Sequence, residues 1–179
     1  MTRKILIVED TPAMARVQKH IALKAGYEVD IAESLAQTKE LISKNSYFCA
    51  VVDFILPDAP SGEAVPCTIN ADIPTIVMTG NIDKKTRDTV EKYPIIDYII
   101  KENKQAYQYL EKQLQRLPRN ENVKVLVVDD SKSTRRYICS LLVRHKYQII
   151  EAQDGQEALN LLEASPDISV IITDNEIPN

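Results

Sequence analysis

The chain has 179 residues and a formal net charge of -4, with 44% hydrophobic and 27% charged residues. This composition excludes a fibrous or disordered chain, and the acidic balance argues against a nucleic-acid partner. No apolar run approaches the roughly 20 residues of a membrane-spanning helix, and no secretory signal is recognisable. The three cysteines lack metal-ligand spacing and indicate reduced thiols in a cytoplasmic protein.

Short apolar, β-branched runs alternate with helical patterns over the first 117 residues. Such runs are typical of strands buried on both faces of a parallel sheet. Strands are predicted at Ile5–Val8, Tyr27–Ala32, Cys49–Val52, Ile76–Met78 and Tyr98–Ile100.

The first predicted helix begins near Pro12 and ends at Gly26, a residue suited to the position after a helix. Its apolar residues Val17, Ile21 and Ala25 recur at a spacing of four, so we expect them to face the core.

The other helices are expected after Ser34, which can cap a helix, then near Pro66, at 83–92 and at Lys104–Leu117. Pro66 predicts a short or distorted third helix. The last helix is clearly amphipathic. Five strand–helix units predict an α/β fold with a doubly wound parallel sheet.

The pattern of the first strand recurs after a whole domain length. "ILIVED" at 5–10 returns as "VLVVDD" at 125–130, an offset of 120, and "AVVDFILP" at 50–57 returns as "IITDNEIP" at 171–178, where the aspartate is offset by 121. We therefore expect a complete domain at 1–118, a linker at 119–122 and the first half (βαβαβ) of a second copy at 123–179. The second copy is interpreted as a truncated domain of a longer protein, although a natural half-domain stays open.

Polar residues follow the predicted strands of the first copy. Glu9 and Asp10 follow the first strand, Asp53 the third, Thr79 the fourth and Lys101 the fifth. In open α/β sheets, sites form at these carboxyl ends. Asp10 alone could simply begin a turn or cap a helix. Several acids together either raise a pKa or hold a divalent cation, and oxygen ligands favour Mg2+.

This set of residues resembles the receiver domain of bacterial two-component response regulators, in full over 3–117 and in part over 123–179. The resemblance implies a flavodoxin-like sheet of order 2-1-3-4-5. It implies that Glu9, Asp10 and Asp53 hold Mg2+, and that Asp53, in "VVDFILP", accepts a phosphoryl group. Thr79 would sense that group and Lys101 would pair with it.

The resemblance also implies a signalling role and not an enzyme. Asp53 would take the phosphoryl group from a phosphohistidine on a sensor kinase or phosphotransfer protein. Thr79 and the aromatic Tyr98 would then pass on a conformational change, although Tyr98 could simply be a core residue. Tandem receivers resemble the input regions of larger regulators, some of which end in a diguanylate cyclase, so a missing output domain could be an enzyme.

Two features distinguish this chain from the family pattern. Lys101 is followed by Glu102 where the family usually has proline, so we expect a trans peptide bond there. The second copy carries Asp129, Asp130 and Asp174 at its strand ends but no later Thr or Lys.

Two other functions stay open beside the phosphorylated switch. One is a receiver-like interaction module that is never phosphorylated. The other is an aspartate-nucleophile phosphohydrolase, which generally needs a second acid where this chain has Ile55.

The third strand of the second copy is apolar and uncharged. Without a neighbouring fourth strand, such an edge is a template for pairing. We expect residues 169–173 to be covered by a second copy of the chain, by the first domain or by residues outside this sequence.

Overall fold

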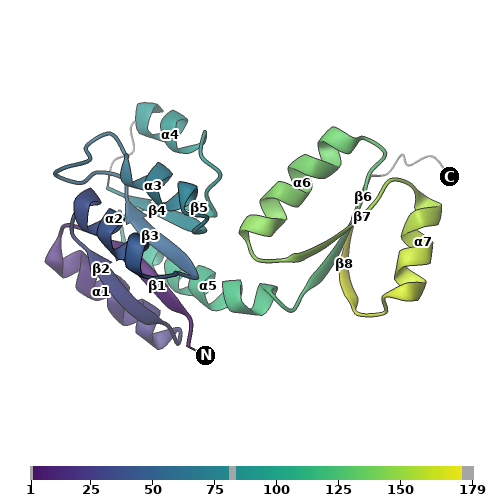
Figure 1. The fold of residues 1–179 in the computed structure, drawn as a ribbon, viewed down its shortest axis with the longest axis horizontal. Helices are drawn as coiled ribbons and strands as arrows, with labels where there is room; N and C mark the ends of the chain where they lie inside the picture. The colour runs from purple at the N-terminus through teal and green to yellow at the C-terminus, as the bar shows by residue number, and fades with distance from the viewer. Residues whose placement is uncertain (1, 81–83, 175–179) are drawn as a thin grey trace. The chain divides into compact units, whose positions relative to one another are not determined.

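The computed structural model describes residues 2–80 and 84–174. The chain divides into two compact units, Met1–Gln115 and Arg116–Asn179, which are treated separately below (Figure 1). None of the helices in the described ranges is long and apolar enough to cross a membrane.

The first unit contains the predicted doubly wound sheet. Five parallel strands are ordered β2-β1-β3-β4-β5. Their bounds are β1 Lys4–Val8, β2 Glu28–Ala32, β3 Cys49–Asp53, β4 Thr75–Thr79 and β5 Asp97–Ile100. The apolar residues of β1 and β3 are fully buried, as the continuous apolar runs predict for central parallel strands.

Helices cover both faces of this sheet. They are α1 Pro12–Lys24, α2 Leu35–Lys44, α3 Ala64–Asn70, α4 Lys84–Val90 and α5 Lys104–Asn120. One core cluster joins side chains of α2, α3 and α4 to the sheet. On the α1–α5 pair, Lys24 forms an ion pair with Glu111 at 2.8 Å, and the Tyr107 hydroxyl contacts the Met14 sulfur at 3.0 Å.

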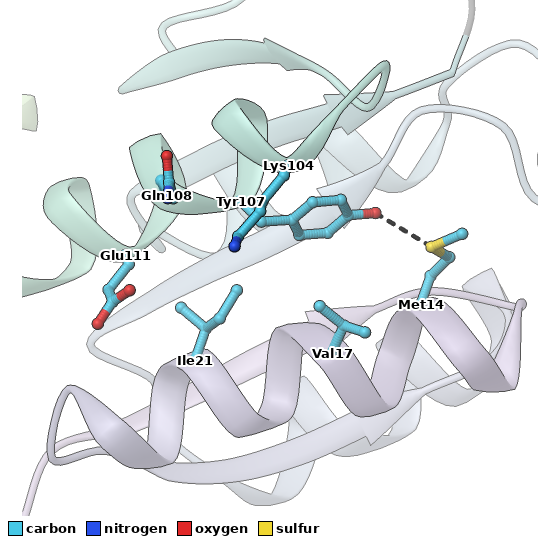
Figure 2. A pocket seen from close by; sticks show the side chains of 7 residues that line it. All are labelled: Met14, Val17, Ile21, Lys104, Tyr107, Gln108 and Glu111. Atoms are coloured by element: carbon cyan, nitrogen blue, oxygen red, sulfur yellow. Dashed lines mark hydrogen bonds between the residues drawn. The ribbon is translucent and has the colours of Figure 1, made fainter.

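The inward face of α1 differs from the prediction at Val17. The buried residues of α1 are Ala15, Gln18, Ile21 and Ala22, whereas Val17 is 43% exposed. Val17 instead lines an apolar groove of about 480 Å³ between α1 and α5 (Figure 2). The buried side of α1 therefore includes Ile21, as predicted, but Gln18 takes the inward position that was expected for Val17.

The third helix is short, as predicted from its proline. α3 has seven residues, and Pro66 is its third residue. Pro66 lies in the first turn of the helix and not in its interior. Proline is tolerated there because the first N–H groups of a helix have no partner within the helix.

The last helix of the first unit extends past its predicted end. α5 continues through Pro118 to Asn120, over the first half of the expected linker at 119–122. Proline cannot donate a hydrogen bond to the carbonyl four residues earlier, which here belongs to Leu114. The buried hydroxyl of Tyr27 donates to that carbonyl at 2.7 Å. This external partner satisfies the carbonyl, so Pro118 is compatible with a continuous helix.

The second unit repeats the first part of this fold. Its elements are β6 Lys124–Val128, α6 Lys132–Arg144, β7 Gln148–Ala152, α7 Gly155–Ala164 and β8 Ile168–Thr173. The strands form a parallel sheet of order β7-β6-β8. The first four elements lie 120 residues after their counterparts β1 to α2. The predicted repeat is therefore structural as well as sequential.

A β-bulge explains why the offset changes from 120 to 121 within the repeat. β6 and β8 pair as Lys124 with Ile168 and then Val125 with Val170, so one residue of β8 is passed over. In the first unit, Ile5 pairs with Cys49, 121 residues before Val170. The extra residue is accommodated at the start of the strand, and the register beyond it is conserved between the two units.

Candidate functional site

Backbone hydrogen bonds just beyond the strands hold the predicted site residues in register. The N–H of Glu9 donates to Ala32 at 2.9 Å, which extends the β1–β2 ladder by one residue. The N–H of Lys101 donates to the carbonyl of Thr79 at 2.8 Å and extends the β4–β5 ladder in the same way. The side chains of these residues therefore leave the sheet from fixed positions at its carboxyl edge.

Lys101 joins two of the predicted acids. Its Nζ lies 2.7 Å from Asp53 Oδ2 and 2.5 Å from Glu9 Oε2. The side chain of Glu9 is only 1% exposed, and those of Lys101 and Asp53 are 9% and 12% exposed. The ammonium group thus bridges two carboxylates that water reaches poorly, and its charge offsets part of the repulsion between them. The peptide bond between Lys101 and Glu102 is trans, as expected without proline.

The surroundings of Lys101 act on its pKa in opposite directions. Burial disfavours the charged ammonium and lowers the pKa. The hydrogen bonds and negative charges of Asp53 and Glu9 favour the charged form and outweigh burial, so the pKa lies above its ordinary value. Lys101 is therefore a permanent cation of the site at neutral pH.

The three predicted metal ligands converge. Glu9, Asp10 and Asp53 each offer a carboxylate oxygen, and these oxygens lie within 4.8 Å of one another. Asp10 and Asp53 are partly exposed, which leaves access for a hydrated ion. A small set of hard oxygen ligands beside open solvent fits Mg2+, which keeps several of its waters.

Gln18 belongs to this site but was not predicted from the sequence. Its Nε2 donates to Glu9 Oε2 at 2.8 Å, and the side chain is 1% exposed. The available signal was a polar residue three positions after Ala15 and three before Ile21, on the inward stripe of α1.

Thr79 and Tyr98 occupy different environments. Thr79 ends β4 with a fully buried side chain. Tyr98, on β5, is half-buried and packs against the core cluster that joins α2, α3 and α4 to the sheet. Tyr98 is therefore partly a core residue, which was one of the two predictions for it. The rest of its side chain borders solvent.

The loop after Asp53 is tightly held. Gly62 has φ +86°, and a Cβ atom added to it would lie 2.2 Å from the ring of Phe54, the residue next to Asp53. Asp58 accepts hydrogen bonds from the N–H groups of Leu35 at 2.9 Å and Ala36 at 3.1 Å, which ties the loop to the start of α2. The chain on both sides of the Asp53 carboxylate is therefore constrained.

The candidate acids of the second unit are less closely gathered. Asp129 is buried and accepts from the N–H of Ser131 at 2.8 Å, while Asp130 and Asp174 are exposed. Within the described ranges, the one group of three or more acids, histidines or cysteines whose ligand atoms lie within 4.8 Å of one another is that of Glu9, Asp10 and Asp53. Pro178, which completes the expected motif after Asp174, lies outside the described residues.

Comparison with known proteins identifies the family. The family model for the response regulator receiver domain matches residues 5–114 and 125–179, which correspond to the two units. The chain is 46% identical over 57 residues to the chemotaxis protein CheY1 of Helicobacter pylori, an alignment that covers 31% of this chain and 46% of that protein. The chain thus spans less than half the length of such curated relatives.

Solved structures agree with the family match. One described as a two-component system response regulator/GGDEF domain protein is 34% identical with a TM-score of 0.86, and the match covers 99% of this chain and 73% of that one. The receiver domain of sensor histidine kinase PA1611 from Pseudomonas aeruginosa, described with a magnesium ion in its active site cleft, is 25% identical with a TM-score of 0.54. That match covers 65% of this chain and 97% of the other. The chain belongs to the response regulator receiver domain family of two-component signalling.

Proposed function

We propose that the first unit is a phosphorylation-dependent switch in which Asp53 accepts a phosphoryl group from a phosphohistidine. The observation that carries this proposal is the geometry at Lys101, whose ammonium group bonds both Asp53 and Glu9. The acceptor carboxylate therefore has a fixed cation beside it and two further acids within metal-binding distance.

The reaction is a displacement at phosphorus. An oxygen of the Asp53 carboxylate attacks, the P–N bond to the donor imidazole breaks, and the imidazole nitrogen leaves and takes up a proton. The product on the protein is a mixed carboxylic–phosphoric anhydride. Because both reactants are anionic, fixed positive charge lowers the barrier most.

Lys101 supplies part of that charge. Its ammonium group already lies 2.7 Å from Asp53 and can remain close as a phosphoryl group arrives. Glu9, Asp10 and Asp53 would hold Mg2+, which when bound offsets the repulsion between the carboxylate and the phosphoryl oxygens. The comparison supports this assignment, since a related receiver domain is described with magnesium in its active site cleft.

The signal would leave the site through Thr79 and Tyr98. A phosphoryl group adds about -1.5 to -2 charge and strong hydrogen-bond acceptors. The Thr79 hydroxyl would turn toward it, and Tyr98 on the neighbouring strand β5 would change its packing as Thr79 moves. The α4–β5–α5 surface would then differ between the two states.

The partners follow from this chemistry. The phosphoryl donor would be a sensor histidine kinase or a histidine phosphotransfer protein. The GGDEF domain of the similar solved structure supports an output domain of that kind, a diguanylate cyclase, in the whole protein.

The test is phosphorylation of the whole 179-residue chain with acetyl phosphate and Mg2+, followed by intact-mass analysis. The wild-type chain is expected to gain one phosphoryl group that hydroxylamine removes, as an acyl phosphate requires. Asp53→Asn should abolish the gain. Asp174→Asn, the matched change in the second unit, should leave it intact.

Two results would contradict the proposal. A wild-type chain that gains no phosphoryl group, while a known receiver is phosphorylated in parallel, would favour the non-phosphorylated interaction module. A gain that survives Asp53→Asn and disappears with Asp174→Asn would move the acceptor to the second unit.

A further inference from the structure

Gln18 is a buried amide on the inward face of α1. Its side chain is 1% exposed, and its neighbours on that face are Ala15, Ile21 and Ala22. Burying an amide in such surroundings is costly unless it forms hydrogen bonds. The hydrogen bond from Gln18 Nε2 to Glu9 Oε2 offsets the cost of burying the amide. Hydrogen bonds to a carboxylate are stronger than those to a neutral acceptor.

The second unit offers an internal comparison, because α6 and β6 lie 120 residues after α1 and β1. The position of Glu9 is taken there by Asp129, and that of Gln18 by Ile138. The long acid thus occurs with the buried amide, and the short acid with an apolar residue.

The local contacts of the two acids explain this pairing. The carboxylate of Asp129 accepts from the N–H of Ser131 at 2.8 Å. The corresponding bond, from the N–H of Thr11 to Glu9 Oε1, is stretched to 3.3 Å. Glutamate has one more methylene group than aspartate, so its carboxylate lies further from the backbone that would fix it. Gln18 supplies a further anchor for the longer side chain, on the same oxygen, Glu9 Oε2, that Lys101 contacts from β5.

We propose that Gln18 is a positioning residue for the Mg2+ site of the first unit. It holds the Glu9 carboxylate in one orientation, within 4.8 Å of the ligand oxygens of Asp10 and Asp53. Residues that orient metal ligands in this way typically change metal affinity by about 10- to 100-fold when they are replaced. The inference rests on the proposed function, since it assigns Mg2+ to these three acids.

The test is a double-mutant cycle in the whole chain, with Mg2+ alone as the titrant and backbone amide shifts in NMR spectra as the readout. The four proteins are the wild type, Gln18→Ile, Glu9→Asp and the Glu9→Asp/Gln18→Ile double variant, which carries the residue pair of the second unit. Gln18→Ile is expected to raise the Mg2+ dissociation constant about tenfold beside Glu9, and by less than about twofold beside aspartate.

The cycle separates positioning from folding. A residue that merely filled the core would change affinity equally in both backgrounds, and so would overturn the proposal. An unchanged dissociation constant for Gln18→Ile beside Glu9 would overturn it as well. Should Gln18→Ile not fold, Gln18→Met keeps the side-chain length while removing the donor, and the same outcomes apply to it.

The cycle also distinguishes this inference from the proposed function. If the wild type binds Mg2+ and is phosphorylated on Asp53 but the cycle shows no coupling, the role of Gln18 alone is wrong. If the wild type neither binds Mg2+ nor is phosphorylated, both are wrong.

Discussion

Replacing Lys101 by methionine removes the ammonium group between Asp53 and Glu9 while keeping most of the side-chain volume. The two acids then face each other with ligand oxygens within 4.8 Å and exposures of only 12% and 1%. At that distance, an effective dielectric constant near 20 gives a repulsion of about 3 kcal/mol. The loss of one partner from a buried ion pair costs a similar amount, about 3–5 kcal/mol. We therefore expect Lys101→Met to lower the free energy of unfolding of the first unit by about 3 kcal/mol at pH 7 without Mg2+.

The loss should depend on metal and on pH. Mg2+ at about 100 times its dissociation constant contributes about 2.7 kcal/mol, so the variant with Mg2+ should come close to the stability of the metal-free wild type. The pKa of Lys101 is raised in the folded state, so its contribution is complete below the ordinary value of 10.5 and is lost as the pH rises through the folded pKa.

The assay is native-state amide exchange, read on the slowest amides of β1 and β3, which report unfolding of the first unit. The matched control is Lys44→Met. Lys44 pairs with Glu40 at 2.6 Å, but both side chains are more than 60% exposed, and such solvent-screened pairs contribute little to stability. A cost for Lys101→Met no larger than that of the control would refute the reasoning. So would a variant whose free energy of unfolding does not rise with Mg2+ toward that of the metal-free wild type.

Three further outcomes test other parts of the structure. Asp10→Ala should weaken Mg2+ binding and slow phosphorylation by acetyl phosphate together, whereas Asp130→Ala should change neither. If Asp10→Ala slowed phosphorylation without weakening Mg2+ binding, Asp10 would not be a Mg2+ ligand. Tyr27→Phe should lower the free energy of unfolding by about 1–3 kcal/mol in denaturant titration, because a buried carbonyl of α5 loses its donor. The exposed edge at 169–173 should pair with another copy, so light scattering should detect dimers that dissociate on dilution and that Ile171→Lys prevents; a monomer at every concentration would contradict this.

The positions of the main site residues could be predicted because strand ends follow directly from the pattern of apolar runs. The apolar runs of β1 and β3 are buried on both faces, so the end of each run is marked by the first polar residue, Glu9 or Asp53. Lys101 follows the apolar end of the partly buried strand β5 in the same way. Parallel pairing then brings those ends to one edge of the sheet. The grouping of these side chains at one edge of the sheet was thus accessible without coordinates.

Features that depend on how helices rotate and pack against the sheet could not be predicted from the apolar pattern. Whether Val17 or Gln18 faces the sheet is a matter of about 100° of rotation, and the apolar spacing favoured the wrong residue. Pro118 indicated a linker because its local effect is to end helices, and only the distant hydroxyl of Tyr27 makes it acceptable. Both errors arise where tertiary contacts outweigh local preference.

Because of the contact between Gly62 and Phe54, mutations can damage the site at a position well away from the residues that would touch a ligand. Position 62 lies nine residues after Asp53, the proposed acceptor, yet any side chain there would both strain a left-handed backbone and collide with the ring of Phe54. In a random mutagenesis screen for lost signalling, substitutions at this distant glycine should therefore be recovered together with those of Asp53.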